Sequence, residues 1–348
     1  MRQSAIFFFL LLFVVPCTLS SQDQHFTQFY SSALTLNPAL SGAFDGGYRL
    51  STVYRDQGNR ILDAPYTTFS GAVDLRFPVK SKVKTGKDAF GTGVIFYSDH
   101  SAATNFYTNQ IGLTGSFHKA LDRKGSQFLS AGVQLGISQR NVNYENITFH
   151  DQFHIVDGYA YPTQENLPVN NFAFGDLAAG IHYSYAPNRQ PGIFAGIAAY
   201  HLLEPAVSFY GKEDLSGAKL YRKYAAHVGL LIPLGMAVQF SPRALVYKQG
   251  PHLAANAGAN WRFLLQESKG YALHLGGWLR PVRNANKEFG LDAAIAMLGI
   301  EHSNFLIGMS YDIGLSSLNL QNNRVGAFEL SIAFLGNYNN ETILCPKF

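Results

Sequence analysis

Histidine, aspartate and glutamate side chains are the groups of this chain best suited to catalysis, but their spacing does not define an active site. His150 and His154 are four residues apart, which would let two imidazoles share a metal ion on one helix face. The segment around them is polar and supplies neither a third ligand nor the glutamate of a zinc protease. The other candidates are scattered along the chain: Asp99, His100, Glu204 and Asp214.

A nucleophilic mechanism has no better support. No GxSxG motif occurs, so a triad of serine, histidine and acid has no evident nucleophile. We therefore expect no catalytic residue, no cofactor-binding residue and no metal site, and we interpret the two histidines as part of an exposed loop. The chain is predicted not to be an enzyme.

The composition of the 348 residues is unusual for a soluble protein. Charged residues make up only 14%, whereas hydrophobic residues reach 47% and aromatic residues 14%. Ordinary soluble domains contain roughly 25% charged residues, so much of this surface need not face water. The basic residues are scattered, apart from a run between 80 and 87 that we interpret as a solvated turn. No nucleic-acid partner is expected.

The first twenty residues predict export. Arg2 precedes an uninterrupted apolar run over 6–15, Pro16 ends the run, and small residues follow before a plausible cleavage point. We therefore predict a cleaved signal peptide at 1–20. Cys17 leaves a lipoprotein as an alternative, although Pro16 is a poor residue to precede a lipidated cysteine. Beyond the signal peptide no apolar run approaches the ~18 residues of a membrane helix.

The main structural signal is an alternation with a period of two. Between Gln127 and Gln139, five apolar residues alternate with serine, glycine and glutamine. The same alternation recurs at 106–117, 305–314 and 327–334. A strand with lipid on one side and a lumen on the other has this pattern.

Fourteen such segments can be counted, an even number, as in bacterial single-chain barrels. They lie near 47–55, 66–77, 90–99, 106–119, 127–139, 172–185, 191–202, 221–232, 236–247, 252–264, 271–281, 288–299, 303–314 and 325–335. The predicted fold is therefore all-β: a transmembrane antiparallel β-barrel of about 14 strands over 47–335, exported to the outer membrane. A soluble all-β fold is the alternative, but it would cover its outer face with charges.

The connections are expected to differ between the two ends of the barrel. The longest, 140–171 and 203–220, would lie outside the cell, and most of the short turns would face the periplasm. The remainder is divided into an N-terminal periplasmic or plug-like segment at 21–46 and a periplasmic C-terminal tail at 336–348. Phe26, Phe29 and nearby apolar residues recur at helical spacing, which predicts a short amphipathic helix over 23–36. An extended arm is the alternative.

Charged residues also fall within the predicted strands. On the lipid face, an arginine or lysine at the bilayer midplane would cost ~2–4 kcal/mol. We therefore expect these side chains to point into the lumen or to lie at strand ends, where they would pair, stabilise a plug or line a solute path. The seven residues are Asp74, Arg76, Arg262, Arg280, Asp292, Asp312 and Glu329.

Two stretches at opposite ends of the chain carry motifs with a recognisable order. One runs from Gln22 through Phe26-Thr27-Gln28-Phe29 to Thr68, and the other runs from Ser310 to Phe348. Their most specific positions are Asn37, Pro38, Tyr54, Arg55, Gln57, Pro65, Tyr66, Tyr311, Asp312, Arg324, Gly326, Glu329, Cys345 and Pro346. This paired order resembles the PorP/SprF family, whereas the middle of the chain, about 80–300, matches only in its strand rhythm.

The resemblance implies an outer-membrane component of the type IX secretion and gliding machinery. Members of the SprF kind support the export or surface retention of a cognate adhesin that carries a type B C-terminal signal domain. Members of the PorP kind associate with the periplasmic ring and with peptidoglycan-linked parts of the machinery, and the sequence is compatible with either kind. The implied partners are that adhesin, other type IX secretion and periplasmic components, and outer-membrane lipid. The family-like ending also gives Cys345 two interpretations, a free periplasmic thiol or a point of intermolecular linkage.

The width of the predicted barrel leads to a hypothesis about which of its parts contact the cargo and which contact the secretion machinery. A barrel of about 14 strands is too narrow to pass a folded adhesin domain. We therefore expect loops 140–171 and 203–220 to hold the terminal domain of the cargo, with 22–46 and 336–348 facing the machinery. The alternative function is a passive porin or a hydrophobic-solute channel.

Overall fold

The computed structural model describes most of the chain. The described residues are 23, 25–58, 65–79, 87–145, 147–187, 190–210, 219–266, 270–283, 288–315 and 326–336. Among them no helix combines the length and the apolar character needed to cross a membrane. The predicted signal peptide at 1–20 and the tail from 337 lie outside the described residues.

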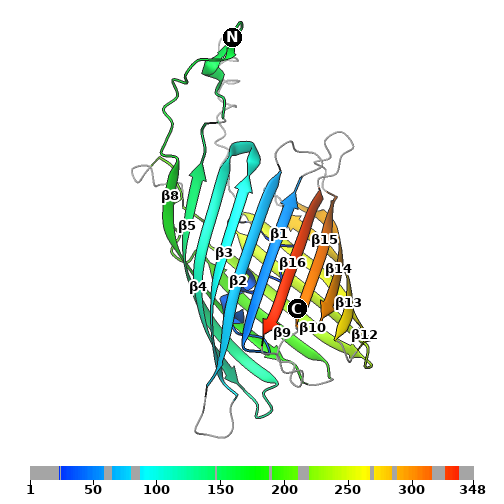
Figure 1. Cartoon of the computed structure of the whole chain (residues 1–348). Helices are drawn as coiled ribbons and strands as arrows, with labels where there is room; N and C mark the ends of the chain where they lie inside the picture. Colours follow the sequence, from blue (N-terminus) through cyan, green and yellow to red (C-terminus); the bar gives the residue numbers. More distant parts are fainter. Residues whose placement is uncertain are drawn as a thin grey trace, which may run out of the picture.

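The described strands close into an antiparallel barrel of fourteen strands, as the alternation predicted (Figure 1). Each strand pairs with its sequence neighbours, apart from the hairpin β6–β7, and β1 closes the barrel against β16. Predicted and observed strand bounds differ by at most three residues. The barrel strands are β1 (Tyr48–Gln57), β2 (Tyr66–Pro78), β3 (Ala89–Ser101), β4 (Phe106–Ala120), β5 (Gln127–Val142), β8 (Asn171–Tyr185), β9 (Gly192–Tyr200), β10 (Lys223–Leu234), β11 (Val238–Gln249), β12 (His252–Gln266), β13 (Tyr271–Arg283), β14 (Phe289–His302), β15 (Phe305–Gly314) and β16 (Gly326–Gly336).

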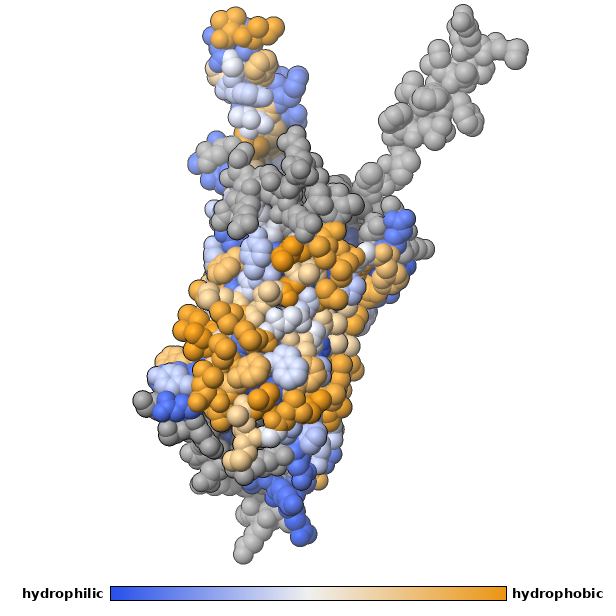
Figure 2. All heavy atoms as spheres, turned by 90° about the vertical axis from the view of Figure 1, so that its right-hand side faces the viewer, coloured by the Kyte–Doolittle hydropathy of each residue, from blue (hydrophilic) through white to orange (hydrophobic). Residues whose placement is uncertain are grey.

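The outer face of the barrel is apolar. Figure 2 shows a belt of hydrophobic residues around the middle of the visible face, with hydrophilic residues beyond it. On β4 and β5, residues such as Ile111, Leu113 and Ile137 point outward, whereas their neighbours Thr114 and Ser138 are buried. Outward apolar side chains suit a sheet that lipid surrounds. The closed barrel also pairs the backbone groups of its strands with one another, as an apolar medium requires.

The two ends of the barrel differ. One, the loop end, carries the long connections from 143 to 170 and from 201 to 222, and the other, the turn end, carries connections as short as Ser303-Asn304. Long outer loops and short periplasmic turns are typical of such barrels, so we expect the loop end to face the cell exterior. The first long connection rises above the rim as an extension between β5 and β8, and it contains η3 (His150–Gln152), β6 (Phe153–His154) and β7 (Gly158–Tyr159) (Figure 1).

Residues 23 and 25–46 lie inside the barrel and run from the loop end to the turn end. Asp23 contacts His201 and Gln249, which follow or end strands at the loop end, and Gly47 donates a backbone hydrogen bond to Gly336 at the turn end. We call this stretch the lumen segment. Its apolar side chains pack against inward residues of the wall, so the main hydrophobic core lies within the lumen.

The predicted helix over 23–36 is wrong for most of its length. The lumen segment contains only α2 (Ala33–Leu36) and the 3-10 turn η1 (Pro38–Leu40), and residues 27–32 form turns. The physical reason is that the wall surrounds the segment. Polar residues between the apolar ones, such as Thr27 and Gln28, are buried as well, so the apolar spacing does not mark one face of a helix.

Small inward residues let the lumen segment approach the wall closely. A Cβ atom added to Gly132 on β5 would lie 2.6 Å from the backbone nitrogen of Ala39. One added to Gly91 on β3 would lie 2.0 Å from the carbonyl oxygen of Ser41. Any larger residue at these positions would displace the segment, which explains part of the glycine content of the inward face.

Candidate functional site

The segment Thr27-Gln28 is bound to the wall by a buried cluster of charged residues, here called the anchor cluster. Glu329 on β16 accepts hydrogen bonds from the backbone N–H of Thr27 at 2.6 Å and of Gln28 at 2.9 Å. Its side chain is fully buried. The side-chain amide of Gln28 donates to Ser310 at 3.1 Å and its oxygen accepts from Ser331 at 2.8 Å. Strand β16 thus binds two backbone N–H groups of the lumen segment, and β15 and β16 together bind the side chain of Gln28.

Two arginines complete the anchor cluster. Arg55 on β1 pairs with Glu329 at 2.5 Å and with Asp312 at 3.1 Å, and Arg280 on β13 pairs with Asp312 at 2.8 Å. The hydroxyl of Thr27 donates to Asp312 at 2.9 Å and accepts hydrogen bonds from both arginines. Arg280 also pairs with Asp292 on β14 at 3.6 Å. Each buried arginine and each buried acid of the cluster therefore has a partner of opposite charge, as a buried cluster of charges requires.

A second contact fastens the turn-end half of the lumen segment. Asp74 on β2 accepts a hydrogen bond from the backbone N–H of Gly42 at 2.8 Å, and it forms an ion pair with Arg49 at 2.8 Å. Arg49 also donates to the carbonyl of Leu40 at 3.1 Å. The buried side chain of Asn37 donates to the carbonyl oxygens of Ile181 and Ile197 on the opposite wall, at 3.0 and 3.2 Å. The segment is thus tied to both sides of the barrel.

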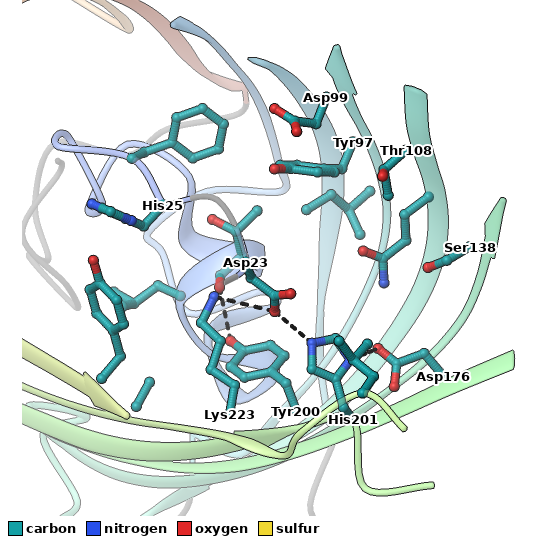
Figure 3. Close-up of a pocket in the computed structure, with 18 of the residues that line it drawn as sticks. Asp23, His25, Tyr97, Asp99, Thr108, Ser138, Asp176, Tyr200, His201 and Lys223 are labelled. Carbon is teal, nitrogen blue, oxygen red and sulfur yellow. Dashed lines mark hydrogen bonds and ion pairs between the residues drawn. The ribbon is translucent and has the colours of Figure 1, made fainter. Parts of the chain in front are cut away.

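At the loop end the first described residue of the segment forms a charged latch. The Asp23 carboxylate lies 2.5 Å from Nε2 of His201, and Nδ1 of the same imidazole lies 2.9 Å from Asp176 (Figure 3). Lys223 adds a longer contact with Asp23 at 3.7 Å. His201 follows β9 with a φ of 57°, a left-handed conformation in which histidine is enriched among non-glycine residues.

The latch shifts the pKa values of both partners. Burial by itself lowers the pKa of His201, but the carboxylates of Asp23 and Asp176 outweigh it and raise that pKa to about 9. Burial acts to raise the pKa of Asp23, and the charges of His201 and Lys223 overcome it and hold that pKa well below its ordinary value. At neutral pH the latch is therefore an imidazolium between two carboxylates.

Between the latch and the opposite wall lies a cavity of about 470 Å³. The lumen segment bounds it with His25, Phe26 and Phe29. Figure 3 shows polar side chains of the far wall, among them Tyr97, Thr108 and Ser138, facing across it toward the latch.

The structure brings together several of the predicted site residues. Arg55, Asp312 and Glu329, which lie at opposite ends of the sequence, meet in the anchor cluster, and Gln57 accepts a hydrogen bond from Arg55 at 3.2 Å. Asn37 and Pro38 belong to the lumen segment. Gly326 begins β16, and Pro65 precedes β2.

Other predicted positions lie elsewhere. Tyr54 points outward toward lipid and Tyr311 lies on the same outer face, whereas Tyr66 lines the rim of the cavity. Arg324, Cys345 and Pro346 lie outside the described residues. Of the other strand charges, Arg76 points inward and contacts the carbonyl of Gly42, and Arg262 pairs with Glu301 at 2.7 Å. Asp292 lies near the start of β14, where its side chain is 40% exposed and pairs with Arg280 at 3.6 Å.

Sequence reasoning missed the latch and the role of Thr27. Asp176, His201 and Lys223 come from strands far apart in sequence from Asp23, so no local pattern connects them. Within the described residues no group of three or more histidine, cysteine or acidic side chains is arranged to hold a metal ion. His154 pairs instead with Asp157 at 3.3 Å in the exposed hairpin.

Comparison with known proteins places this geometry in a family. The family model for the type IX secretion system membrane protein PorP/SprF matches residues 18–334. The chain belongs to this family. The match includes the lumen segment, every described barrel strand apart from the last residues of β16, and all four charges of the anchor cluster. A search of curated proteins gives no match.

Solved structures share the barrel fold of this PorP/SprF protein. A FadL homologue of Pseudomonas aeruginosa has a TM-score of 0.50 at 14% identity, covering 87% of this chain and 94% of that one. The toluene transporter TbuX of Ralstonia pickettii has a TM-score of 0.45 at 12% identity, covering 89% and 94%. The monoaromatic hydrocarbon channel CymD has a TM-score of 0.49 at 9% identity, covering 90% and 94%. At such identities the likeness concerns the fold alone.

Proposed function

We propose that this outer-membrane barrel of the type IX secretion machinery anchors a cognate secreted adhesin at the cell surface and does not serve as its export pore. The observation that supports this role is the lumen segment, which the anchor cluster, Asp74 and the latch bind inside the barrel. A closed lumen argues against passage of a polypeptide through it. It leaves the loop end as the surface for a cargo protein.

The connection above β5 and β8 presents an apolar tip that suits such a contact. Ile155 is 91% exposed and Val156 is 82% exposed, at the turn between β6 and β7. Phe153 and Tyr159 stack edge to face at 5.2 Å beneath the tip. Two aliphatic side chains so exposed on one short hairpin are expected to become buried against a partner. The occupant we propose is the C-terminal signal domain of the adhesin.

The test uses the two aliphatic residues of the tip. Replacing both with aspartate (I155D and V156D) is expected to release the adhesin into the medium, because two charges would be buried without partners in the interface. The matched control adds the same two negative charges to this connection away from the tip, Q164E and N166D, at two exposed residues. Barrel folding is checked by the gel mobility of unheated samples. Normal surface retention of the adhesin by the tip variant would refute the anchoring surface.

A second candidate function has one specific observation in its favour. The cavity in the lumen, together with a fold like that of a FadL homologue, is compatible with a hydrophobic-solute channel. Planar-bilayer recordings of the purified protein separate the two proposals. Steady channels in the unmodified protein would favour the solute channel, and a silent barrel would favour the plugged anchor.

A further inference from the structure

The lumen cavity has the construction of a binding site. It is bounded on one side by the lumen segment and is lined by residues of β2–β5 and β8–β11. Phe106, one of its lining residues, packs edge to face at 6.2 Å against Phe209 of the connection after β9. A volume of about 470 Å³ falls within the range of roughly 300–1,000 Å³ that small-molecule sites occupy.

The acidic residues of the cavity are already paired. Asp23 and Asp176 are held by His201, and Asp99 accepts a hydrogen bond from Thr68 at 2.7 Å. A cationic ligand would therefore have to displace an existing partner. Lys223 is likewise paired with Asp23.

Arg140 on β5 is different. It lines the cavity, and its guanidinium lies over the ring of Phe174 with 5.7 Å between the guanidinium carbon and the ring centroid. It belongs to none of the ion pairs of the described residues, although the charge of Asp23 acts on it from a longer distance, and its Nε has no hydrogen-bond acceptor. An arginine fork presented in this way matches the two oxygens of a carboxylate.

Other groups of the cavity also lack partners. The side-chain oxygen of Gln134, a residue only 6% exposed, and the hydroxyl of Tyr247 are buried without a described hydrogen-bond partner. Buried polar atoms rarely stay unsatisfied, so they indicate a ligand or water. The remaining wall is apolar and aromatic, with Phe26, Ile95 and Phe106 among its residues.

We propose that the cavity binds a small amphipathic monoanion, a molecule with an apolar ring or short chain and one carboxylate. The carboxylate lies against the Arg140 fork, and the apolar part packs on the aromatic wall. This site is independent of the anchoring function, since it lies beneath the loops and inside the barrel.

The test compares three probes of one shape: 4-phenylbutyrate, 4-phenylbutanol and 4-phenylbutylamine. Binding is measured by equilibrium dialysis against the full-length mature protein in lipid nanodiscs, with empty nanodiscs correcting for partition into lipid. The acid is expected to bind at least about tenfold more tightly than the alcohol or the amine, because a hydrogen-bonded ion pair with arginine adds to the same apolar contacts.

Variants then assign the charge to one residue. R140Q is expected to reduce binding of the acid to the level of the alcohol and to leave the alcohol unchanged. R222Q is the matched control, because Arg222 pairs with Glu204 at 3.4 Å outside the cavity. If R140Q does not fold, the probe series on the unmodified protein still decides. Equal binding of the three probes, no specific binding of any, or retention of tight acid binding by a folded R140Q barrel would each overturn the proposal.

Discussion

Glu329 offers the sharpest test of what holds the lumen segment in place. It pairs with Arg55 at 2.5 Å and accepts the backbone N–H groups of Thr27 and Gln28 at 2.6 and 2.9 Å. Glu329→Gln preserves its shape but removes its charge. One of the two backbone donors, or Arg55, then faces the amide nitrogen of glutamine, which is itself a donor. Arg55 is then left with Asp312 as its acidic partner, and Asp312 is shared with Arg280, which also pairs with Asp292 at 3.6 Å.

The lost ion pair with Arg55 sets the expected free-energy cost of this change. Removing one partner of a buried ion pair costs roughly 3–5 kcal/mol. Suppose that the lower figure, about 3 kcal/mol, is the amount by which binding of the lumen segment to the wall is weakened. The equilibrium constant for detachment of the segment then rises about 150-fold, since each 1.36 kcal/mol is a factor of ten. The barrel itself is expected to persist, because its strand pairing does not depend on this side chain.

Two measurements on the folded barrel report detachment. The lumen segment offers chymotrypsin several sites, among them Phe26 and Phe29, so cleavage there should accelerate strongly in E329Q, and bilayer conductance should appear. The control is E301Q, because Glu301 is equally buried but pairs with Arg262 and His274 on neighbouring strands. If the two variants cleave and conduct alike, the anchor cluster does not retain the segment and the reasoning fails.

Two further perturbations act on the same segment at other points. Gly132→Val would place a side chain within 2.6 Å of the backbone at Pro38-Ala39, so chymotryptic cleavage of the lumen segment should increase. Gly277→Val is the control, because nothing lies within 4 Å of a Cβ at that position, and it should leave cleavage unchanged. Equal cleavage of the two variants would contradict the close contact at Gly132. The latch should respond to pH. The pKa of His201 is raised to about 9. The stabilisation that its charged imidazole gives to the bound lumen segment is therefore complete below the ordinary histidine pKa of about 6.5, and it is lost as pH rises through about 9. The contribution of Asp23 is lost only in acid. Cleavage near Phe26, normalised to a peptide substrate, should therefore rise between neutral pH and about pH 10 in the unmodified protein, and a similar rise in H201Q would exclude the latch as its cause.

The strands were predictable because lipid imposes the alternation directly on the sequence. Ile111, Leu113 and Ile137 must face outward, and each neighbour must face the lumen, so the period of two identifies the strands without any tertiary information. The inward direction of charges such as Asp312 was also predictable, because a charged side chain in lipid costs free energy. The partners of those charges were not predictable. Arg55 meets Asp312 and Glu329 only because β1 closes against β16, a contact across almost the whole chain.

The lumen segment misled the sequence interpretation for a related reason. Helical spacing of Phe26, Phe29 and Ala33 predicts one buried face, but a segment within a barrel is buried on every face. Its backbone N–H groups at Thr27 and Gln28 are satisfied by Glu329, so they do not need a helix. The cavity residues come from separate strands, and nothing in their local sequence marks Arg140 as the cation without an acidic partner.

The distribution of charge indicates how the lumen segment is held. From 26 to 44 the segment contains no aspartate, glutamate, lysine, arginine or histidine, so the wall binds it through backbone groups, hydroxyls and side-chain amides. The arginines and acids of the anchor cluster pair with one another within the wall. Departure of the segment would therefore leave these ion pairs in place, and water could replace the lost hydrogen bonds. Outside that stretch the described segment carries Asp23 at the loop end and Asp45 at the turn end. The latch matches the charge of Asp23 with His201 and Lys223, and it lies beneath the loops where we place the cargo.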